Sequence, residues 1–215
     1  PQNVVTALLN AGEWPGLPVL DGIVYAPTFA RDGTLHTAPG YDARTRLYNA
    51  GNVQLGDTTP TAATVQAALA LFYGDLVVDF PFADNASRAH ALALYLLPFV
   101  RRMIDGPTVM HMVRATRGTG KSLLVSMALL PALGELPEPI TSSPDPSEMD
   151  KVLTAKVLEG ASYLFIDNIN GKLDSAALAS ALTQTRFNRR LLGTNATVSG
   201  KVDWVWAGTS TNPAL

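Results

Sequence analysis

The feature that most constrains this chain is a glycine-bearing loop between two apolar segments. The sequence ATRGTGKS occupies residues 115–122, after the run TVMHMV and before the run SLLVSMALL. The first run predicts a buried β-strand and the second predicts a helix, with the glycines marking the turn between them. The fold must therefore contain a strand, a loop and a helix in direct succession, with a loop backbone that can adopt positive φ.

A loop of this kind is suited to an anion. Its N–H groups and the positive end of the helix dipole can surround a phosphate, a lysine can reach the terminal phosphates, and a hydroxyl can ligate Mg²⁺. Ala115 stands where the common pattern has glycine, and the alternative is a surface turn with a solvated lysine. We expect ATP and Mg²⁺ to be bound by Arg117, Gly118, Thr119, Gly120, Lys121, Ser122 and Leu123.

A second carboxylate is expected where the apolar strand YLFIDN ends. Asp167 would hold Mg²⁺ together with Ser122, although an aspartate can also simply end a strand. Asn168 follows Asp167, at a position where many ATPases with this strand and loop arrangement have glutamate. Its amide can orient water but cannot accept a proton. The sequence therefore predicts nucleotide binding and leaves hydrolysis open. Asp174 is either a substitute carboxylate or the N-cap of the helix SAALASAL.

The apolar run VDWVWAGTSTN predicts a strand with a polar tip. Its tryptophans and Val205 are expected on opposite faces. Asn212, Thr211 and Thr209, in that order, are candidates to contact the γ-phosphate or the attacking water. The alternative is that they are turn residues before a proline.

Three arginines, Arg186, Arg189 and Arg190, lie in the segment TRFNRR. Arginine keeps its charge and can stabilise phosphoryl transfer from a neighbouring subunit. The alternative is a solvated basic helix end.

The wider chain predicts an α/β protein whose parallel sheet is covered on both faces, because apolar strands alternate with helices over residues 107–215. Residues 1–56 read as a β-rich segment with a hairpin turn at Asp32-Gly33, and residues 57–106 as a helical lead-in. In the lead-in, Thr59 is the expected N-cap of one helix, and a second helix is expected over about 85–104. Asp145 or Ser147 is the expected start of a later helix, after a short strand.

Charge and composition exclude little. The chain has a net charge of −2 and no cysteine, which fits a reducing, cytoplasmic location. Its longest apolar run, residues 91–100, is too short to cross a membrane. Arg31, Arg44 and Arg46 suggest a separate possibility, a DNA-binding module in the N-terminal strands.

Together these motifs resemble P-loop ATPases of the AAA+ and superfamily 3 type, especially the helicase-like domains of phage and plasmid primase-helicase proteins. RGTGKSLL resembles Walker A, YLFIDN Walker B, NRRLLG an arginine-finger segment and VWAGTSTNP sensor 1. The resemblance implies a P-loop NTPase core of the ASCE type, truncated after sensor 1. The catalytic residues that it implies are Lys121, Asp167, Asn168, Asn212, Arg189 and Arg190.

The implied function is an ATP-hydrolysing motor of a DNA helicase or translocase in mobile-element replication. Such a motor works as a homo-oligomeric ring on DNA, with nucleotide between subunits. The alternative is a hydrolysis-deficient nucleotide-binding module for assembly or regulation.

Overall fold

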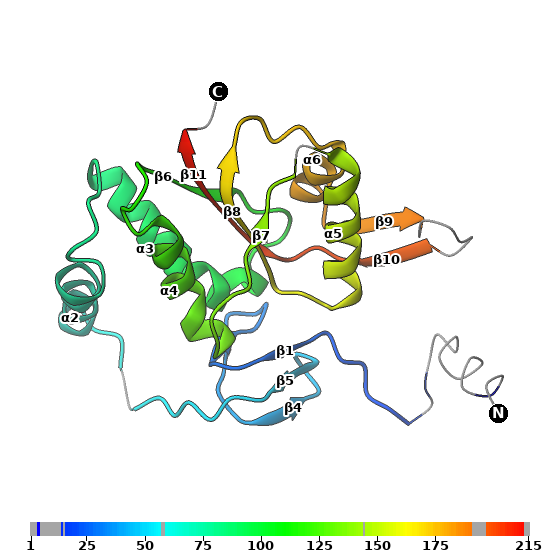
Figure 1. Ribbon diagram of the computed structural model, residues 1–215. Coiled ribbons are helices and arrows are strands. Elements are labelled where there is room, and N and C mark those ends of the chain that lie inside the picture. The colour runs from blue at the N-terminus through cyan, green and yellow to red at the C-terminus, as the bar shows by residue number, and fades with distance from the viewer. Residues whose placement is uncertain are drawn as a thin grey trace.

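The computed structural model describes residues 16–56, 59–143, 145–190 and 197–212, together with Val4 and Trp14. This part of the chain is a mixed α/β structure with five α-helices and a four-stranded parallel sheet (Figure 1). The sheet order is β6 (Met110–Arg114), β11 (Val205–Asn212), β8 (Tyr163–Asn170), β7 (Ile140–Thr141). The helices are α2 (Ala62–Leu71), α3 (Asn85–Val100), α4 (Lys121–Leu133), α5 (Pro146–Leu158) and α6 (Ala176–Thr183). The predicted α/β class is confirmed.

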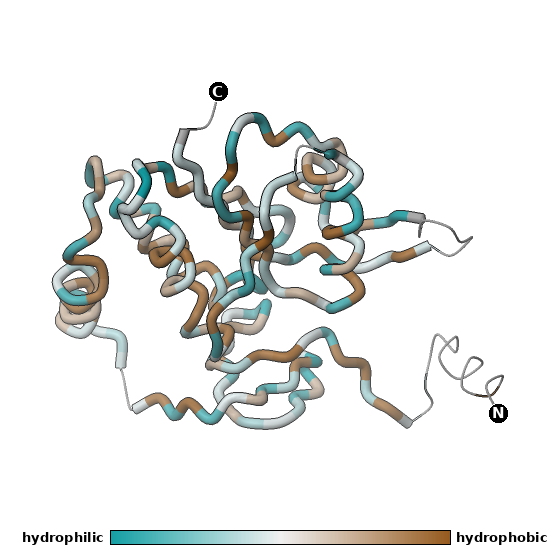
Figure 2. The backbone as a smooth tube through the Cα atoms, in the orientation of Figure 1, coloured by the Kyte–Doolittle hydropathy of each residue, from teal (hydrophilic) through white to brown (hydrophobic). Residues whose placement is uncertain are grey.

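Side chains of the two central strands alternate between two apolar layers. Trp206 and Ile166 pack with α5 and α6, whereas Ala207 and Phe165 pack with α3 and α4. All four side chains are buried, and Figure 2 shows hydrophobic stretches along the central strands and the helices beside them. The strand pattern follows because a sheet covered on both faces must be apolar on both. The expected opposition of Val205 to the two tryptophans is confirmed.

The helical segment begins later than its sequence suggests. Thr61, not Thr59, is the N-cap of α2: its hydroxyl accepts from the Thr64 N–H, and the Thr64 hydroxyl accepts from the Thr61 N–H. This reciprocal capping box satisfies two helix-end donors, which the expected cap at Thr59 would not do. The α2 helix continues as one π-helical turn, Phe72–Leu76.

The second helix of this segment, α3, ends earlier than expected, at Val100, and a 3₁₀ turn, Arg101–Met103, follows it. Pro98 lies inside its last turn, where the missing N–H removes one helical hydrogen bond. None of the helices in the described part of the chain has the length and apolar character that crossing a bilayer requires.

Helix starts in the second half of the chain are set by side-chain caps. Asp145 caps α5 by accepting from the Ser147 N–H at 2.8 Å, as expected, and the short strand β7 precedes it. Asp174 was expected to cap the next helix, but Ser175 does so by accepting from the Leu178 N–H at 3.2 Å. Asp174 instead forms a fully exposed ion pair with Lys172.

The N-terminal segment forms small sheets beside the core, as Figure 1 shows. Strand β5 (Leu47–Asn49) pairs in parallel with β1 (Gly22–Val24) and antiparallel with β4 (Gly40–Asp42). Strands β2 (Thr28–Phe29) and β3 (Leu35–His36) form an antiparallel hairpin across the predicted Asp32-Gly33 turn. The Thr28 hydroxyl donates to the Phe99 carbonyl at 2.9 Å and ties this hairpin to α3.

The basic segment TRFNRR is a strand, so the interpretation as a helix end was wrong. Strand β9 (Arg186–Arg190) pairs antiparallel with β10 (Thr197–Lys201). Phe187 and Val198 point into the core and are buried, which fixes the register of the pair. In this segment the apolar residue Phe187 stands between polar residues, and this alternation is the sequence pattern that indicates a strand.

Candidate functional site

The glycine loop, residues 115–122, connects β6 to α4 as predicted. Within it only Gly118 and Gly120 have positive φ, 84° and 81°, and Gly120 is the N-cap of α4. A Cβ at either glycine would meet nothing within 4 Å, so the requirement for glycine comes from the backbone conformation. Ala115 does not have positive φ, and its N–H donates to the Ser210 carbonyl at 3.3 Å. The alanine is therefore compatible with this loop.

Lys121 begins α4 and lies along the inside of the loop. Its Nζ donates to the Thr116 carbonyl at 2.8 Å, and its side chain is buried. The Thr119 hydroxyl donates to the same carbonyl at 2.9 Å. These two bonds close the loop on itself and hold one ammonium group beside the N-terminus of α4, where positive charge from the helix dipole is also directed.

Asp167, on β8, is hydrogen-bonded to the residue that ends the glycine loop. The Ser122 hydroxyl donates to Asp167 Oδ1 at 2.7 Å, and the Thr209 hydroxyl donates to the same oxygen. Strand β11, which carries Thr209, lies between the strand of the loop and the strand of Asp167. The two predicted Mg²⁺ ligands are thus brought together from the first turn of α4 and from β8, which is not a direct neighbour of β6 in the sheet.

A β-bulge shapes the end of β8. Gly208 pairs with Ile166 and Ser210 pairs with Ile169, so Asp167 and Asn168 together oppose the single residue Thr209. Asn168 takes up the extra length with φ of 53°, and its N–H donates to the Thr209 hydroxyl at 2.9 Å. Asparagine is among the non-glycine residues that tolerate this conformation best, so the backbone itself favours asparagine here.

These elements line one open pocket of about 680 Å³. Its lining residues are Arg117, Gly118, Gly120, Lys121, Ser122, Leu123, Asp167, Asn168, Asn170, Thr209 and Thr211. Of the loop residues expected to bind nucleotide, only Thr119 is turned away, toward the loop carbonyl. The pocket lies at the carboxyl ends of β6, β11 and β8, where ligands of open α/β sheets bind.

At the tip of β11, the candidate that was ranked last, Thr209, is the one that contacts Asp167. Thr209, named third of the three candidates, is 1% exposed and bonds to both Asp167 and Asn168. Thr211 lines the pocket, and the side chain of Asn212 lies outside the described part of the structure. Asn170 was not predicted; it lines the pocket from the end of β8, where the register with β11 shifts twice, and sequence spacing does not show those shifts.

Of the arginines of β9 whose side chains are described, Arg186 and Arg189, neither lines this pocket. Arg189 donates from Nε to Asp150 Oδ1 at 3.1 Å, and its guanidinium lies 5.4 Å from the ring centre of Phe187. The side chain of Arg190 lies outside the described residues. Within one chain, therefore, the Arg189 side chain contacts Asp150 of α5 and Phe187 of its own strand.

No protein-family model matches the chain, and no curated protein matches it. The chain is similar to a solved structure described as the A form apo structure of the NrS-1 C-terminal region, with 15% sequence identity and a TM-score of 0.48. The match covers 99% of this chain and 48% of that one, so this chain spans about half of its length.

Proposed function

We propose that this chain is a P-loop domain that binds ATP with Mg²⁺ and hydrolyses it as the motor of a DNA helicase or translocase. The observation that carries the proposal is the 2.7 Å hydrogen bond between Ser122 Oγ and Asp167 Oδ1. This bond joins two groups. One is a hydroxyl in the first turn of the helix that follows the glycine loop, and the other is a carboxylate near the end of a buried strand. Two oxygens in that relation are suited to an octahedral cation whose other ligands are phosphate and water.

The chain's own groups would bind the triphosphate from one side of the pocket. The N–H groups of the loop and the N-terminus of α4 would surround the β-phosphate, because Gly118 and Gly120 give the loop its curl. Lys121 would exchange its bond to the Thr116 carbonyl for one to a phosphate oxygen. A cation–anion bond replaces a cation–dipole bond in that exchange, so it is favourable.

Mg²⁺, when bound, would neutralise charge on the β- and γ-phosphates and orient them for attack. Ser122 and Asp167 would hold it, directly or through water. The Thr209 hydroxyl would keep Asp167 Oδ1 turned toward Ser122, because it donates to that same oxygen from a buried position. The acidic side chain and both hydroxyls are thus already directed toward one point.

Water activation is the less complete part of the site. Asn168 follows Asp167 and lines the pocket, and its amide would orient a water by hydrogen bonding. Asp167 is the only carboxylate among the described lining residues. That observation favours the second candidate function, a module that binds nucleotide for assembly or regulation and turns it over slowly. In the motor, Arg189 and Arg190 would act on nucleotide held by a neighbouring subunit of a homo-oligomeric ring.

A titration of a fluorescent ATP analogue tests the binding proposal, with and without Mg²⁺. Lys121→Ala should abolish Mg²⁺-dependent binding, whereas Lys172→Ala, a change at a lysine that pairs only with exposed Asp174, should leave it unchanged. Equal affinity of wild type and Lys121→Ala would refute the site.

Asn168→Asp then separates the two candidate functions. Aspartate tolerates positive φ nearly as well as asparagine, so this variant adds a carboxylate without the backbone cost that glutamate would carry. A slow wild-type turnover that rises in Asn168→Asp would identify the amide as limiting and favour the binding module. Rapid turnover in the wild type would favour the motor.

A further inference from the structure

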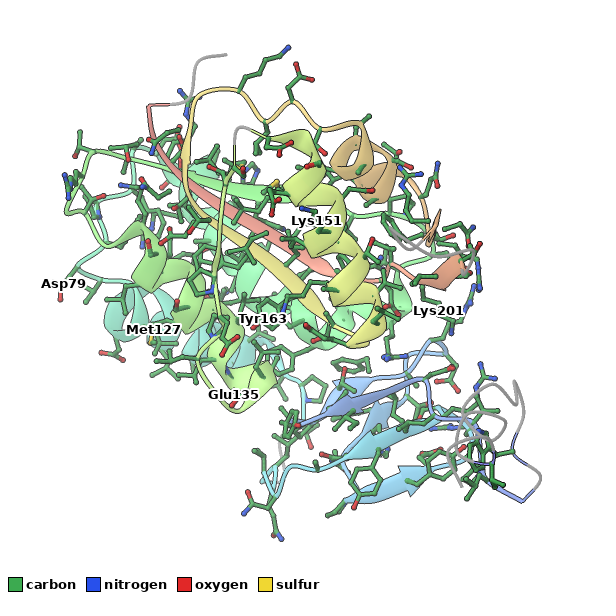
Figure 3. The ribbon with its side chains drawn as sticks, turned by 45° about the vertical axis from the view of Figure 1, so that its right-hand side comes forward. Asp79, Met127, Glu135, Lys151, Tyr163 and Lys201 are labelled. Atoms are coloured by element: carbon green, nitrogen blue, oxygen red, sulfur yellow. The ribbon has the colours of Figure 1, made fainter. Side chains whose placement is uncertain are left out.

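A second pocket, of about 600 Å³, lies where the N-terminal strands meet the core, away from the glycine loop. We call it the junction pocket; turns of the N-terminal segment, the stretch after α3 and the base of the β9–β10 pair line it. Asp21 Oδ2 links its sides, because it accepts from Arg46 at 2.8 Å and from Lys201 at 3.3 Å. Figure 3 shows Lys201 on the part of the core next to the N-terminal sheet.

Positive charge is concentrated in this pocket. Seven of the chain's sixteen lysines and arginines line it, with four aspartates, which leaves an excess of three positive charges. The rest of the chain carries nine basic and fourteen acidic residues, so the protein is acidic everywhere else on average. A local field of this sign in a concave site attracts anions despite the net charge of −2.

Some of these positive charges repel one another and so destabilise the folded state. Lys201 and Arg186 are directly opposite each other on β10 and β9, and like charges in that position destabilise a strand pair. Among the described residues, the Arg186 side chain donates a hydrogen bond to the Ser199 hydroxyl, at 3.2 Å. Arg101 is 5% exposed and donates to backbone carbonyls, among them that of Gly106 at 3.0 Å. Arg186 and Arg101 have no carboxylate within ion-pair distance in the described part of the chain, whereas Lys201 pairs with Asp21.

The paired cations of the junction pocket are available for exchange. Arg31 pairs with Asp105 and Arg44 pairs with Asp32, and all four side chains are more than half exposed to solvent. Exposed ion pairs of this kind contribute little to stability. A stronger anion can therefore displace these carboxylates at little cost to the fold.

We propose that the junction pocket binds the phosphate backbone of a nucleic acid strand, without reading its bases. Guanidinium groups from three segments match a chain of phosphates better than a single one, and arginine binds phosphate through its planar fork. No aromatic ring is among the described lining residues, so the pocket offers backbone contacts rather than base stacking. The choice of a nucleic acid as the polyanion rests on the proposed function; the site itself is independent of the glycine loop.

Anisotropy with a labelled mixed-sequence DNA oligonucleotide, single-stranded and duplex, tests this proposal without any ATP. The triple variant Arg31→Glu, Arg44→Glu, Arg186→Glu should bind at least tenfold more weakly. Its slope of log affinity against log salt should fall by about 2 to 3, since each lost phosphate contact removes about 0.7 to 0.9. Arg186→Glu creates a favourable pair with Lys201, which offsets the loss of the exposed Arg31–Asp105 and Arg44–Asp32 pairs, so this variant should remain folded, as its thermal unfolding will show.

The matched control reverses three exposed cations outside the junction pocket, Arg88, Lys151 and Lys172, with the same change in net charge. It should keep the wild-type affinity and slope. Equal weakening of both triple variants, or wild-type binding to polyglutamate but not to DNA, would overturn the proposal. Lys121→Ala should bind DNA as the wild type does without ATP, so a failure at the glycine loop is distinguished from a failure here.

Discussion

Thr209 offers a precise test of how the site is built. Its hydroxyl accepts from the Asn168 N–H at 2.9 Å and donates to Asp167 Oδ1, and the residue is 1% exposed. Thr209→Val keeps the shape and removes both bonds. Loss of a hydrogen bond to a charged group costs about 1.5 to 3 kcal/mol, and the Asn168 N–H, in an exposed residue, can turn to water. We therefore expect a loss of about 2 kcal/mol in the free energy of unfolding.

For a chain of this size that loss lowers the melting temperature by about 4 to 8 °C. Thermal unfolding by circular dichroism measures it, and Thr209→Ser, which keeps the hydroxyl, is the control with the smaller loss. Because Asp167 also loses its orientation, Mg²⁺-dependent nucleotide affinity should fall about 10- to 100-fold in the valine variant. A valine variant as stable as the wild type, or a serine variant as unstable as valine, would refute the role given to this hydroxyl.

Three further predictions follow from backbone and burial. Asn168→Gly should be neutral or stabilising and Asn168→Ala should cost about 1 kcal/mol in urea unfolding, because φ is 53° there; equal values would contradict the strain argument. Gly118→Ala should cost about 1 kcal/mol through φ alone and weaken ATP-analogue binding, while Gly56→Ala, at an open position without positive φ, should do neither. Burial, reinforced by His90, lowers the pKa of His111, so the unfolded state binds the extra proton first. Stability should therefore fall as pH drops below about 6.5, and His111→Gln should flatten that fall in urea midpoints.

The alternation of apolar strands and helices was enough to predict the covered parallel sheet, because that pattern is a direct consequence of burial on both faces. The glycine loop, with Lys121 and Ser122 at the start of a helix, was also readable, since glycine spacing and helix onset are local properties. Asp167 was predicted from its position at the end of an apolar run downstream of the glycine loop, although β8 itself continues to Asn170.

What sequence reasoning missed depends on contacts between distant strands. The order of the sheet, with β11 between β6 and β8, puts Thr209 against Asp167, and no local pattern encodes that order. The bulge at Asn168 likewise depends on the pairing of β8 with β11, which no local pattern encodes. The junction pocket collects cations from residues more than a hundred positions apart, such as Arg31 and Lys201, so only the fold shows that they meet.

The account depends most on Ser122 and Asp167 forming one Mg²⁺ site with the glycine loop. A double-mutant cycle of Ser122→Ala and Asp167→Asn, followed by Mg²⁺-dependent affinity for an ATP analogue, measures that directly. We expect each single variant to lose most of the Mg²⁺ dependence and the double variant to lose little more, a coupling of about 1 kcal/mol or greater. Additive losses, or nucleotide binding without Mg²⁺ dependence in the wild type, would contradict the account.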